Sequence, residues 1–255
     1  MQSLDCHGFA LTPSFHRSDC PVTVDEILRE FIGFTNQQVG VYMDALAGFE
    51  GHHTRVERQV FRGNRPGSTR IGKDGIPEVT WVSYEDPSKP DIIHNRIVRT
   101  DEYLRANAKG GSNEQQHSRA ILVFLFTYWE DEIRPRLAIA MDVPVNDIKS
   151  DMMGDLRILR NAILHTKAVL GKDKWNDLKK TKEMFTQSEP VSVTYEGMHK
   201  IFSLIKQDCA RMFFELKGIQ TPDFLNTDDI ADFAIQFRRM SSRGPADPSS
   251  KGPQR

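Results

Sequence analysis

Long segments that repeat apolar side chains at helical spacing constrain the fold of this chain more than any other feature of the sequence. From residue 23 to residue 60 the apolar residues recur at steps of three, four or small multiples of these, which is the period of one face of an α-helix. Thr23 and Glu26 form a capping-box pattern at the start of this segment. We therefore expect one long helix that ends between Gly51 and Gly63.

A second helix is expected at "SNEQQHSRAILVFLFTYWEDEIRPRLAIAM", residues 112 to 141. Ser112 and Gln115 repeat the capping pattern at its start. The middle of the segment is apolar on all sides, which is typical of a buried central helix. Pro135 lacks the amide hydrogen that a helix interior needs, so it should bend or end this helix.

Two more helices complete the set of four. The stretch "DLRILRNAILHTKAVLG" predicts a helix from about residue 150 or 151 to residue 170, with Gly171 as its stop. The last main helix is expected from residue 195 to residue 217, with Gly218 beyond its end. Its inward-facing residues are expected to be Ile201, Leu204, Ile205, Met212, Phe213 and Leu216.

The segment from residue 62 to residue 112 has a different character, because its glycines and prolines are too frequent for a helix. Within it, "EVTWVSY" alternates apolar and polar residues as a strand does. We predict an all-α fold: an up-down bundle of four main helices, with an irregular or β-hairpin insertion between the first two. The insertion is also where we look for recognition or regulation, since irregular segments on a rigid bundle often bind.

One helical domain is expected from residue 23 to residue 240. Residues 1 to 22 show no sustained period and are expected to be a loosely ordered lead-in. A short helix is expected at "TDDIADFAIQFRRM", and the tail from residue 241 to residue 255, rich in Pro, Gly and Ser, should be disordered.

Composition excludes several classes of protein. The longest apolar run, residues 120 to 129, is much shorter than the roughly 20 residues that a membrane span needs. The N-terminal residues lack the basic and apolar regions of a secretory signal, so we expect a soluble, cytoplasmic protein that does not enter a membrane. Cys6, Cys20 and Cys209 are widely spaced, without a CxxC pair, which argues against a disulfide framework or a zinc ribbon.

The helix expected at residues 150 to 170 divides its side chains between two faces. On a helical wheel, the packing face holds Leu156, Leu159, Ala162, Ile163 and Leu170. The opposite face holds Arg157, Arg160, Asn161, Leu164 and His165. Arg160 and His165 lie about 140° apart around the axis, and Asn161 stands one turn before His165. A leucine inside this polar stripe indicates that another surface covers it.

A basic cluster overlaps this helix, although the whole chain has a net charge of only −1. From residue 157 to residue 182 there are eight lysines and arginines against two aspartates. Such a run is usually a solvated helix face, but its position beside the polar stripe makes it a candidate site for a polyanion.

With the stretch "RNAILH" the chain resembles the HEPN superfamily of helical-bundle proteins. Many of these are RNases with an R-x4-6-H motif, commonly with a polar residue directly after the arginine. The matching residues here are Arg160, Asn161 and His165, and the resemblance covers the four main helices. It implies a metal-independent endoribonuclease that leaves a cyclic phosphate, needs no cofactor and works as a homodimer with a shared cleft. It also favours a toxin or anti-phage defence effector, with an antitoxin or defence-system partner.

Physical chemistry assigns roles to the same three residues. Cleavage of RNA by its own 2′-hydroxyl needs one proton removed, one proton donated to the leaving oxygen, and positive charge near the phosphoryl oxygens. Arginine stays protonated, so Arg160 is the expected phosphate-binding cation. Imidazole titrates near neutral pH, so His165 is the proton-transfer candidate, with Asn161 as its positioning or phosphate-binding neighbour. A two-fold dimer would supply the second histidine.

Other interpretations remain open. Arg160 and His165 can be a surface ion-pairing arginine and a solvated histidine, and Arg157 a surface residue or a phosphate contact. The second functional class is a catalytically silent HEPN-like binding module that acts with a partner protein.

Three further groups of side chains carry weaker signals. His53 and Glu57 are spaced to share a metal, but two ligands do not make a site. The acids Glu130, Asp131 and Glu132 can partner the arginine or simply end a helix, and the second is the more usual arrangement. Tyr128 and Trp129 are expected in the core.

Overall fold

The computed structural model describes residues 22–61, 70–84, 88, 93–216, 218 and 220–221. The helices and strands follow in the order α1 (Val24–Phe61), β1 (Arg70–Ile71), β2 (Pro77–Tyr84), β3 (Ile93–Arg99), α2 (Thr100–Asn107), α3 (Ser112–Tyr128), the π-helix η1 (Trp129–Ile133), α4 (Arg134–Met141), the 3-10 turn η2 (Val145–Asp147), α5 (Asp151–His165), α6 (Lys172–Asn176), the 3-10 turn η3 (Lys182–Met184) and α7 (Tyr195–Leu216). The fold is all-α, as predicted. The expected lead-in, apart from its last residue, the short helix near residue 230 and the tail lie outside the described residues.

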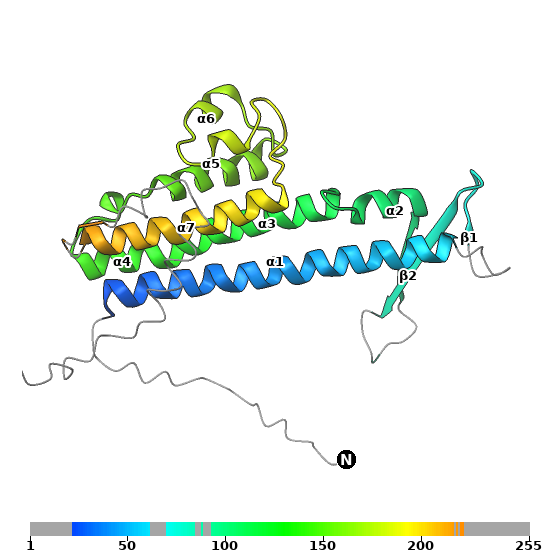
Figure 1. Ribbon diagram of the computed structural model, residues 1–255, viewed down its shortest axis with the longest axis horizontal. Helices are drawn as coiled ribbons and strands as arrows, with labels where there is room; N and C mark the ends of the chain where they lie inside the picture. The colour runs from blue at the N-terminus through cyan, green and yellow to red at the C-terminus, as the bar shows by residue number, and fades with distance from the viewer. Residues whose placement is uncertain are drawn as a thin grey trace, which may run out of the picture.

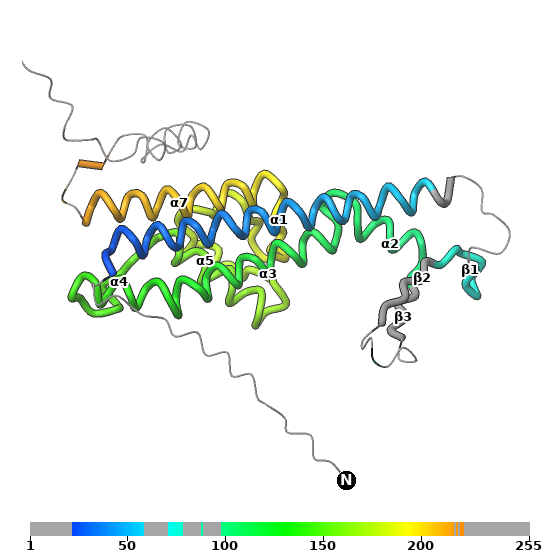
Figure 2. Tube along the Cα trace, turned by 90° about the horizontal axis from the view of Figure 1, so that it is seen from below, coloured from blue at the N-terminus to red at the C-terminus, as the bar shows by residue number. Residues whose placement is uncertain are grey.

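The bundle is elongated, and α1 runs along its whole length (Figure 1). Helices α3 and α7 lie beside α1, and α5 packs on the far side of α3 and α7 (Figures 1 and 2). Successive main helices alternate in direction, which gives the up-down arrangement. At one end α1 extends past the bundle to meet α2 and the small sheet (Figure 2). None of the helices in the described part of the chain combines the length and the apolar character required to span a membrane.

Helix α1 begins and ends as its sequence predicts. The Glu26 amide donates to Thr23 Oγ1 at 3.3 Å, and the Thr23 amide donates to the Glu26 carboxylate at 2.8 Å, so the capping box is present. The Thr23 amide and the Thr23 hydroxyl both donate to the Glu26 carboxylate, and they hold its pKa below the usual value. The helix ends at Phe61, inside the predicted window.

The insertion is more regular than expected. The predicted strand is present as β2, which pairs antiparallel with β1 and β3 in the order β1-β2-β3. Glu78 lies opposite Arg99, the last residue of β3. Helix α2 follows β3 directly and was not predicted. Its first turn carries Asp101 and Glu102, which pair with Arg99 at its N-terminal end.

The predicted capping pair at the start of α3 is wrong. Gly111 is the N-cap residue, and it makes no side-chain capping bond. The Gln115 side chain instead bonds to the backbone of Val193, accepting from its amide at 2.8 Å and donating to its carbonyl at 3.1 Å. Gln115 therefore ties α3 to the segment before α7.

Pro135 neither ends nor sharply interrupts the second main helix. The chain remains helical through η1 into α4, and Pro135 lies in the first turn of α4. In η1 the Arg134 amide donates to Trp129 O, one residue further back than in an α-helix. The wider turn accommodates Pro135 within the helix, since proline has no amide hydrogen to donate.

Helix α3 is not buried on all sides. Ile121, Leu122 and Leu125 are buried, but the Phe124 side chain is 52% exposed. The reason is that α1, α7 and α5 cover only part of its circumference, and the remaining side faces outward.

Helix α5 ends at His165, five residues before the predicted end at Leu170. Lys167 and Ala168 adopt positive φ angles of 55° and 65°, which stop an α-helix. The Ala168 amide donates to Ala162 O at 2.9 Å, closing the end of the helix. Leu170 is still buried, but from the segment that follows the helix.

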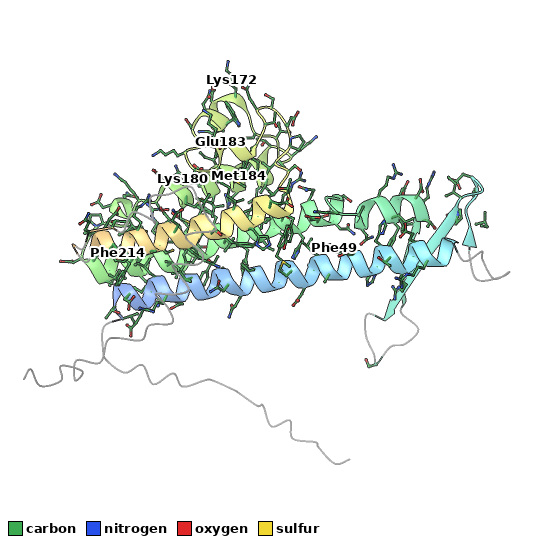
Figure 3. The ribbon with its side chains drawn as sticks, viewed as in Figure 1. Phe49, Lys172, Lys180, Glu183, Met184 and Phe214 are labelled. Carbon is green, nitrogen blue, oxygen red and sulfur yellow. The ribbon has the colours of Figure 1, made fainter. Side chains whose placement is uncertain are left out.

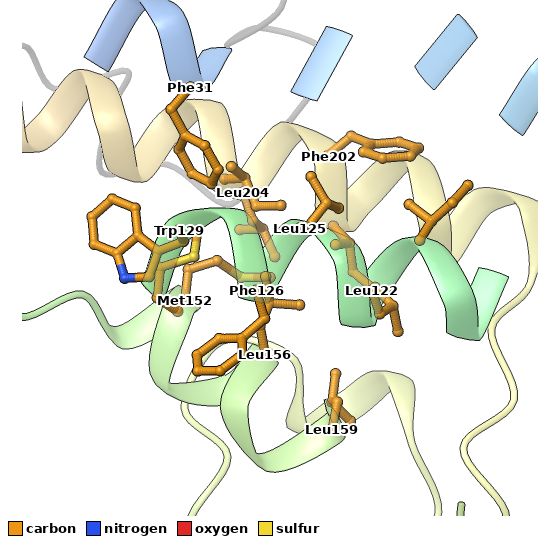
Figure 4. Packing of buried hydrophobic residues seen from close by; sticks show 14 of the residues in the cluster. Phe31, Leu122, Leu125, Phe126, Trp129, Met152, Leu156, Leu159, Phe202 and Leu204 are labelled. Atoms are coloured by element: carbon orange, nitrogen blue, oxygen red, sulfur yellow. The ribbon is translucent and has the colours of Figure 1, made fainter. Parts of the chain in front are cut away.

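Helix α7 matches its prediction except at its end. Gly218 has a φ of 62° just beyond Leu216, which is the left-handed conformation that glycine adopts readily. Leu216 was expected to face inward but is 38% exposed, and Phe213 is only partly buried. The four helices meet in one core, drawn in Figure 4. Its labelled members are Phe31, Leu122, Leu125, Phe126, Trp129, Met152, Leu156, Leu159, Phe202 and Leu204.

Candidate functional site

A groove of about 1050 Å³ runs along the outer face of α5. Its walls come from the end of α3 and η1, from the residues that enter α5, and from the segment that follows α5. That segment, residues 166 to 194, contains α6 and projects from the bundle (Figure 3). The groove is of the size that holds small ligands in proteins.

Three polar side chains of α5 line this groove in a row. Arg157, Asn161 and His165 follow one another at intervals of four residues, and all three are exposed. Leu156 and Leu159 are fully buried on the other side of the helix. The division of α5 into a packing face and an exposed polar face is therefore confirmed for these residues, whereas Ile163 is only partly buried and Leu170 lies beyond the end of the helix.

Arg160, the motif arginine, lies at the edge of this row. It is half-buried, and it is not among the residues that line the groove. Its Nη1 donates to Asn161 Oδ1 at 2.9 Å. Its Nε is buried and has no hydrogen-bond partner among the described residues. The structure thus brings Arg160 and Asn161 together, while His165 stands one turn further along the helix.

Asp155 is a site residue that our reading of the sequence missed. Its side chain is 1% exposed. One carboxylate oxygen accepts from the Lys179 amide, and the other accepts from the Lys180 and Thr181 amides and the Thr181 hydroxyl, at 2.7 to 3.0 Å. Asp155 therefore holds the segment that forms one wall of the groove. The sequence did contain a sign of this role, because Asp155 is an acidic residue on the packing face of the helix.

Ser150 is the N-cap residue of α5, at the start that the sequence suggested. Its Oγ accepts from the Met153 amide at 3.0 Å and also bonds to the Asp208 carboxylate. Burial raises the pKa of Asp208 above its usual value, although Ser150 and Arg211 act in the opposite direction. This bond connects the start of the groove helix to α7.

Several charges of the groove are paired with one another. Arg134 contacts Glu130 at 2.6 Å, Lys179 contacts Asp151 at 2.6 Å, and Lys174 contacts Asp177 at 3.4 Å. The Asp151 side chain raises the pKa of Lys179.

Of the two arrangements considered for Glu130, Asp131 and Glu132, an acidic partner for the motif arginine is not found among the described residues. Glu130 pairs with Arg134 instead, and Asp131 and Glu132 are exposed. Trp129 is buried in the core, as expected. Tyr128 is partly buried against the core, and its hydroxyl donates to Glu30 at 2.7 Å.

The basic cluster is spread over the projecting segment as well as α5. Lys172 stands at its tip, and Lys180 lies near its base (Figure 3). Lys182 is directed over the Trp175 ring, with its Nζ 4.4 Å from the ring centre. The cluster therefore borders the groove but does not form a single continuous face.

A metal site is not found in the part of the chain that the structure describes, where no group of three or more His, Cys, Asp or Glu side chains could hold an ion. His53 and Glu57 both lie on α1. The neighbouring His52 is engaged elsewhere, with its Nδ1 3.0 Å from the Tyr103 hydroxyl.

A second, smaller hollow of about 670 Å³ lies between the exposed sides of α3 and α5. Phe124 and Leu164 line it, and Leu164 is 50% exposed. The exposed leucine of the polar stripe thus belongs to an apolar surface next to the motif.

Comparisons with protein-family models, with curated protein sequences and with solved structures find no match for this chain. The groove itself presents an exposed imidazole, an amide and an exposed guanidinium in one row, from His165, Asn161 and Arg157. These groups can bind an anionic ligand and move a proton.

Proposed function

We propose that the protein is a metal-independent endoribonuclease of the HEPN type, which cleaves RNA by attack of the 2′-hydroxyl and leaves a cyclic phosphate. The observation that carries the proposal is the placement of His165. It is exposed, it lines a groove of about 1050 Å³, and the same row holds Asn161 and a cation. A buried or isolated histidine could not reach a substrate.

The chemical roles follow from the protonation of each side chain. His165 exchanges a proton with the 2′-hydroxyl or with the leaving 5′-oxygen. Arg160 supplies a permanent positive charge beside Asn161, to which its Nη1 is bonded. The charge that develops on the phosphoryl oxygens in the transition state is stabilised by such fixed donors.

A second copy of the chain would complete the site. The reaction moves two protons, and His165 is the one histidine among the residues that line the groove. A homodimer that brings two α5 helices face to face would supply the other imidazole. The exposed Phe124 and Leu164, which line the neighbouring hollow between α3 and α5, add apolar surface of the kind that such an interface needs.

The biological setting that we propose is that of a toxin or an anti-phage defence effector. An RNase of this kind needs restraint in its own cell, so we further propose an antitoxin or defence-system partner.

One observation favours a second function, a catalytically silent binding module that acts with a partner protein. Part of the Arg160 guanidinium is not available to a phosphate, because its Nη1 bonds to Asn161 and its Nε is buried. If Arg160 keeps these positions, it stabilises the helix and does not grip a phosphate.

Cleavage assays separate the two functions. Purified protein is incubated with labelled RNA in EDTA, beside Arg160→Ala and His165→Ala. Arg29→Ala and His53→Ala serve as controls, since both residues lie on α1 and neither is among the groove-lining residues. The nuclease requires cleavage that persists in EDTA, leaves cyclic phosphate ends, and is lost in the two motif variants only. Intact RNA with the wild-type protein favours the binding module.

A further inference from the structure

The row of polar side chains in the groove begins with Arg157, one turn before Asn161. We propose that Arg157 is the residue that grips the substrate phosphate, and that Arg160 is a positioning residue that acts through Asn161. This inference rests on the proposed RNase function and assigns the phosphate contact within the same site.

The geometry of α5 places Arg157 in the substrate path. Residues four apart on an α-helix lie on the same side and are separated by about 6 Å along the axis. Arg157, Asn161 and His165 are spaced in this way, and all three line the groove. Arg160 lies about 140° from His165 around the axis and does not line it. A phosphate beside Asn161 is therefore flanked by Arg157 and His165.

The Arg157 guanidinium is also free to bind. It is exposed, and no carboxylate or hydrogen-bond acceptor among the described residues contacts it. The other groove cations Arg134, Lys174 and Lys179 each have a carboxylate partner. Lys149 also lines the groove, but it is a lysine at the entrance to α5. Arginine is better suited to a phosphate because its planar fork can donate two parallel bonds.

The bond between Arg160 and Asn161 defines the second part of the inference. Asn161 Oδ1 accepts from Arg160 Nη1 at 2.9 Å, so the amide nitrogen of Asn161 is the end left to donate. An amide nitrogen is a donor only. The bond to Arg160 thereby fixes the Asn161 side chain so that its amide nitrogen is available to donate to a phosphoryl oxygen. Arg160 itself does not enter the groove.

Binding measured against salt concentration tests the phosphate contact. The ligand is a fluorescent single-stranded RNA with 2′-O-methyl groups, which cannot be cleaved. Each phosphate contact that is lost reduces the magnitude of the slope of log K against log salt by about 0.7 for a single strand. We expect this decrease for Arg157→Gln but not for Arg160→Gln or for Lys172→Gln, a cation outside the groove lining. Arg157→Lys should keep the slope.

Cleavage kinetics on unmodified RNA test the positioning role. For Arg160→Gln we expect kcat to fall by at least tenfold with KM within about twofold, because the phosphate contact is kept while Asn161 loses its orientation. For Arg157→Gln we expect KM to rise. Urea midpoints equal to that of the wild-type protein show that the variants are folded.

The outcomes distinguish this inference from the function on which it rests. A wild-type protein that neither binds nor cleaves RNA overturns both. A wild-type protein that cleaves RNA, with an unchanged salt slope in Arg157→Gln, overturns the inference alone. If the magnitude of the slope decreases by about 0.7 in Arg160→Gln and is unchanged in Arg157→Gln, the two residues have exchanged roles and the inference is also overturned.

Discussion

Removal of the Asp155 charge should destabilise the protein, because this carboxylate is buried and both of its oxygens accept hydrogen bonds. Its Oδ1 accepts one backbone amide, from Lys179. Its Oδ2 accepts the amides of Lys180 and Thr181 and the Thr181 hydroxyl. In Asp155→Asn one of the two oxygens becomes an NH2 group that cannot accept. Whichever way the side chain turns, at least one backbone amide loses its acceptor, and the bonds that remain lose the negative charge of the carboxylate.

The expected cost follows from these bonds. A buried donor without an acceptor costs about 1 to 3 kcal/mol, and neighbouring losses do not add fully. We therefore expect the free energy of unfolding to fall by about 3 kcal/mol. With a urea m-value of about 2 kcal/mol/M, the unfolding midpoint moves down by about 1.5 M.

Asp151→Asn is the matched control for this experiment. Asp151 lies one turn before Asp155 on α5 and also contacts Lys179, but through its exposed side chain. Exposed ion pairs contribute little, so the midpoint of this variant should stay close to that of the wild type. Hydrogen exchange should speed up at the amides of residues 179 to 181 in Asp155→Asn only. Equal midpoints for the two variants would refute the reasoning.

Four further variants test the packing, the backbone and the surface charges. Leu159→Ala empties a fully buried position and should cost about 3 kcal/mol in urea unfolding, whereas Leu164→Ala, at a half-exposed position, should change the stability of the monomer little but weaken any self-association seen by sedimentation. Lys167→Gly should stabilise the fold by up to about 1 kcal/mol, because glycine adopts its φ of 55° without strain; a lower thermal midpoint contradicts this. Arg136 lowers the pKa of Glu30, so the stabilisation by this carboxylate is present above its unfolded pKa and is lost as the pH falls through its folded pKa; Glu30→Gln should therefore lower the thermal midpoint at neutral pH and match the wild type in acid.

The parts of the fold with local signals could be predicted from the sequence. The capping box of Thr23 and Glu26, the glycine after α7 and the alternation in β2 each depend on residues within a few positions of one another. The end of α5 could not be predicted in this way. Leu170 continues the apolar period, but its amide bonds to Glu189 O and its carbonyl accepts from the Ser188 amide. These partners are distant in sequence, and they draw Leu170 out of the helix.

Some features of the candidate site could likewise be predicted from the sequence, and others could not. The exposure of Asn161 and His165 follows from the helical wheel alone, since the opposite face is apolar. The position of the Arg160 side chain does not, because its bond to Asn161 and the burial of its Nε depend on the folded surroundings of α5. Asp155 could have been found, as an acid among Met152, Leu156 and Leu159 on the packing face needs a partner to be buried. The identity of that partner, the backbone of residues 179 to 181, required the fold.

The π-helical turn η1 also determines which residues reach the groove. A π-turn accommodates one more residue than an α-turn, and within a continuous helix such an extra residue could sit in any turn. Pro135 fixes its place, because a proline ring collides with the carbonyl four residues earlier unless the turn before it is opened. Glu130 and Arg134, which lie in and just after η1, both line the groove and pair with each other. Pro135, which does not line the groove, thus helps to hold one of its walls in register.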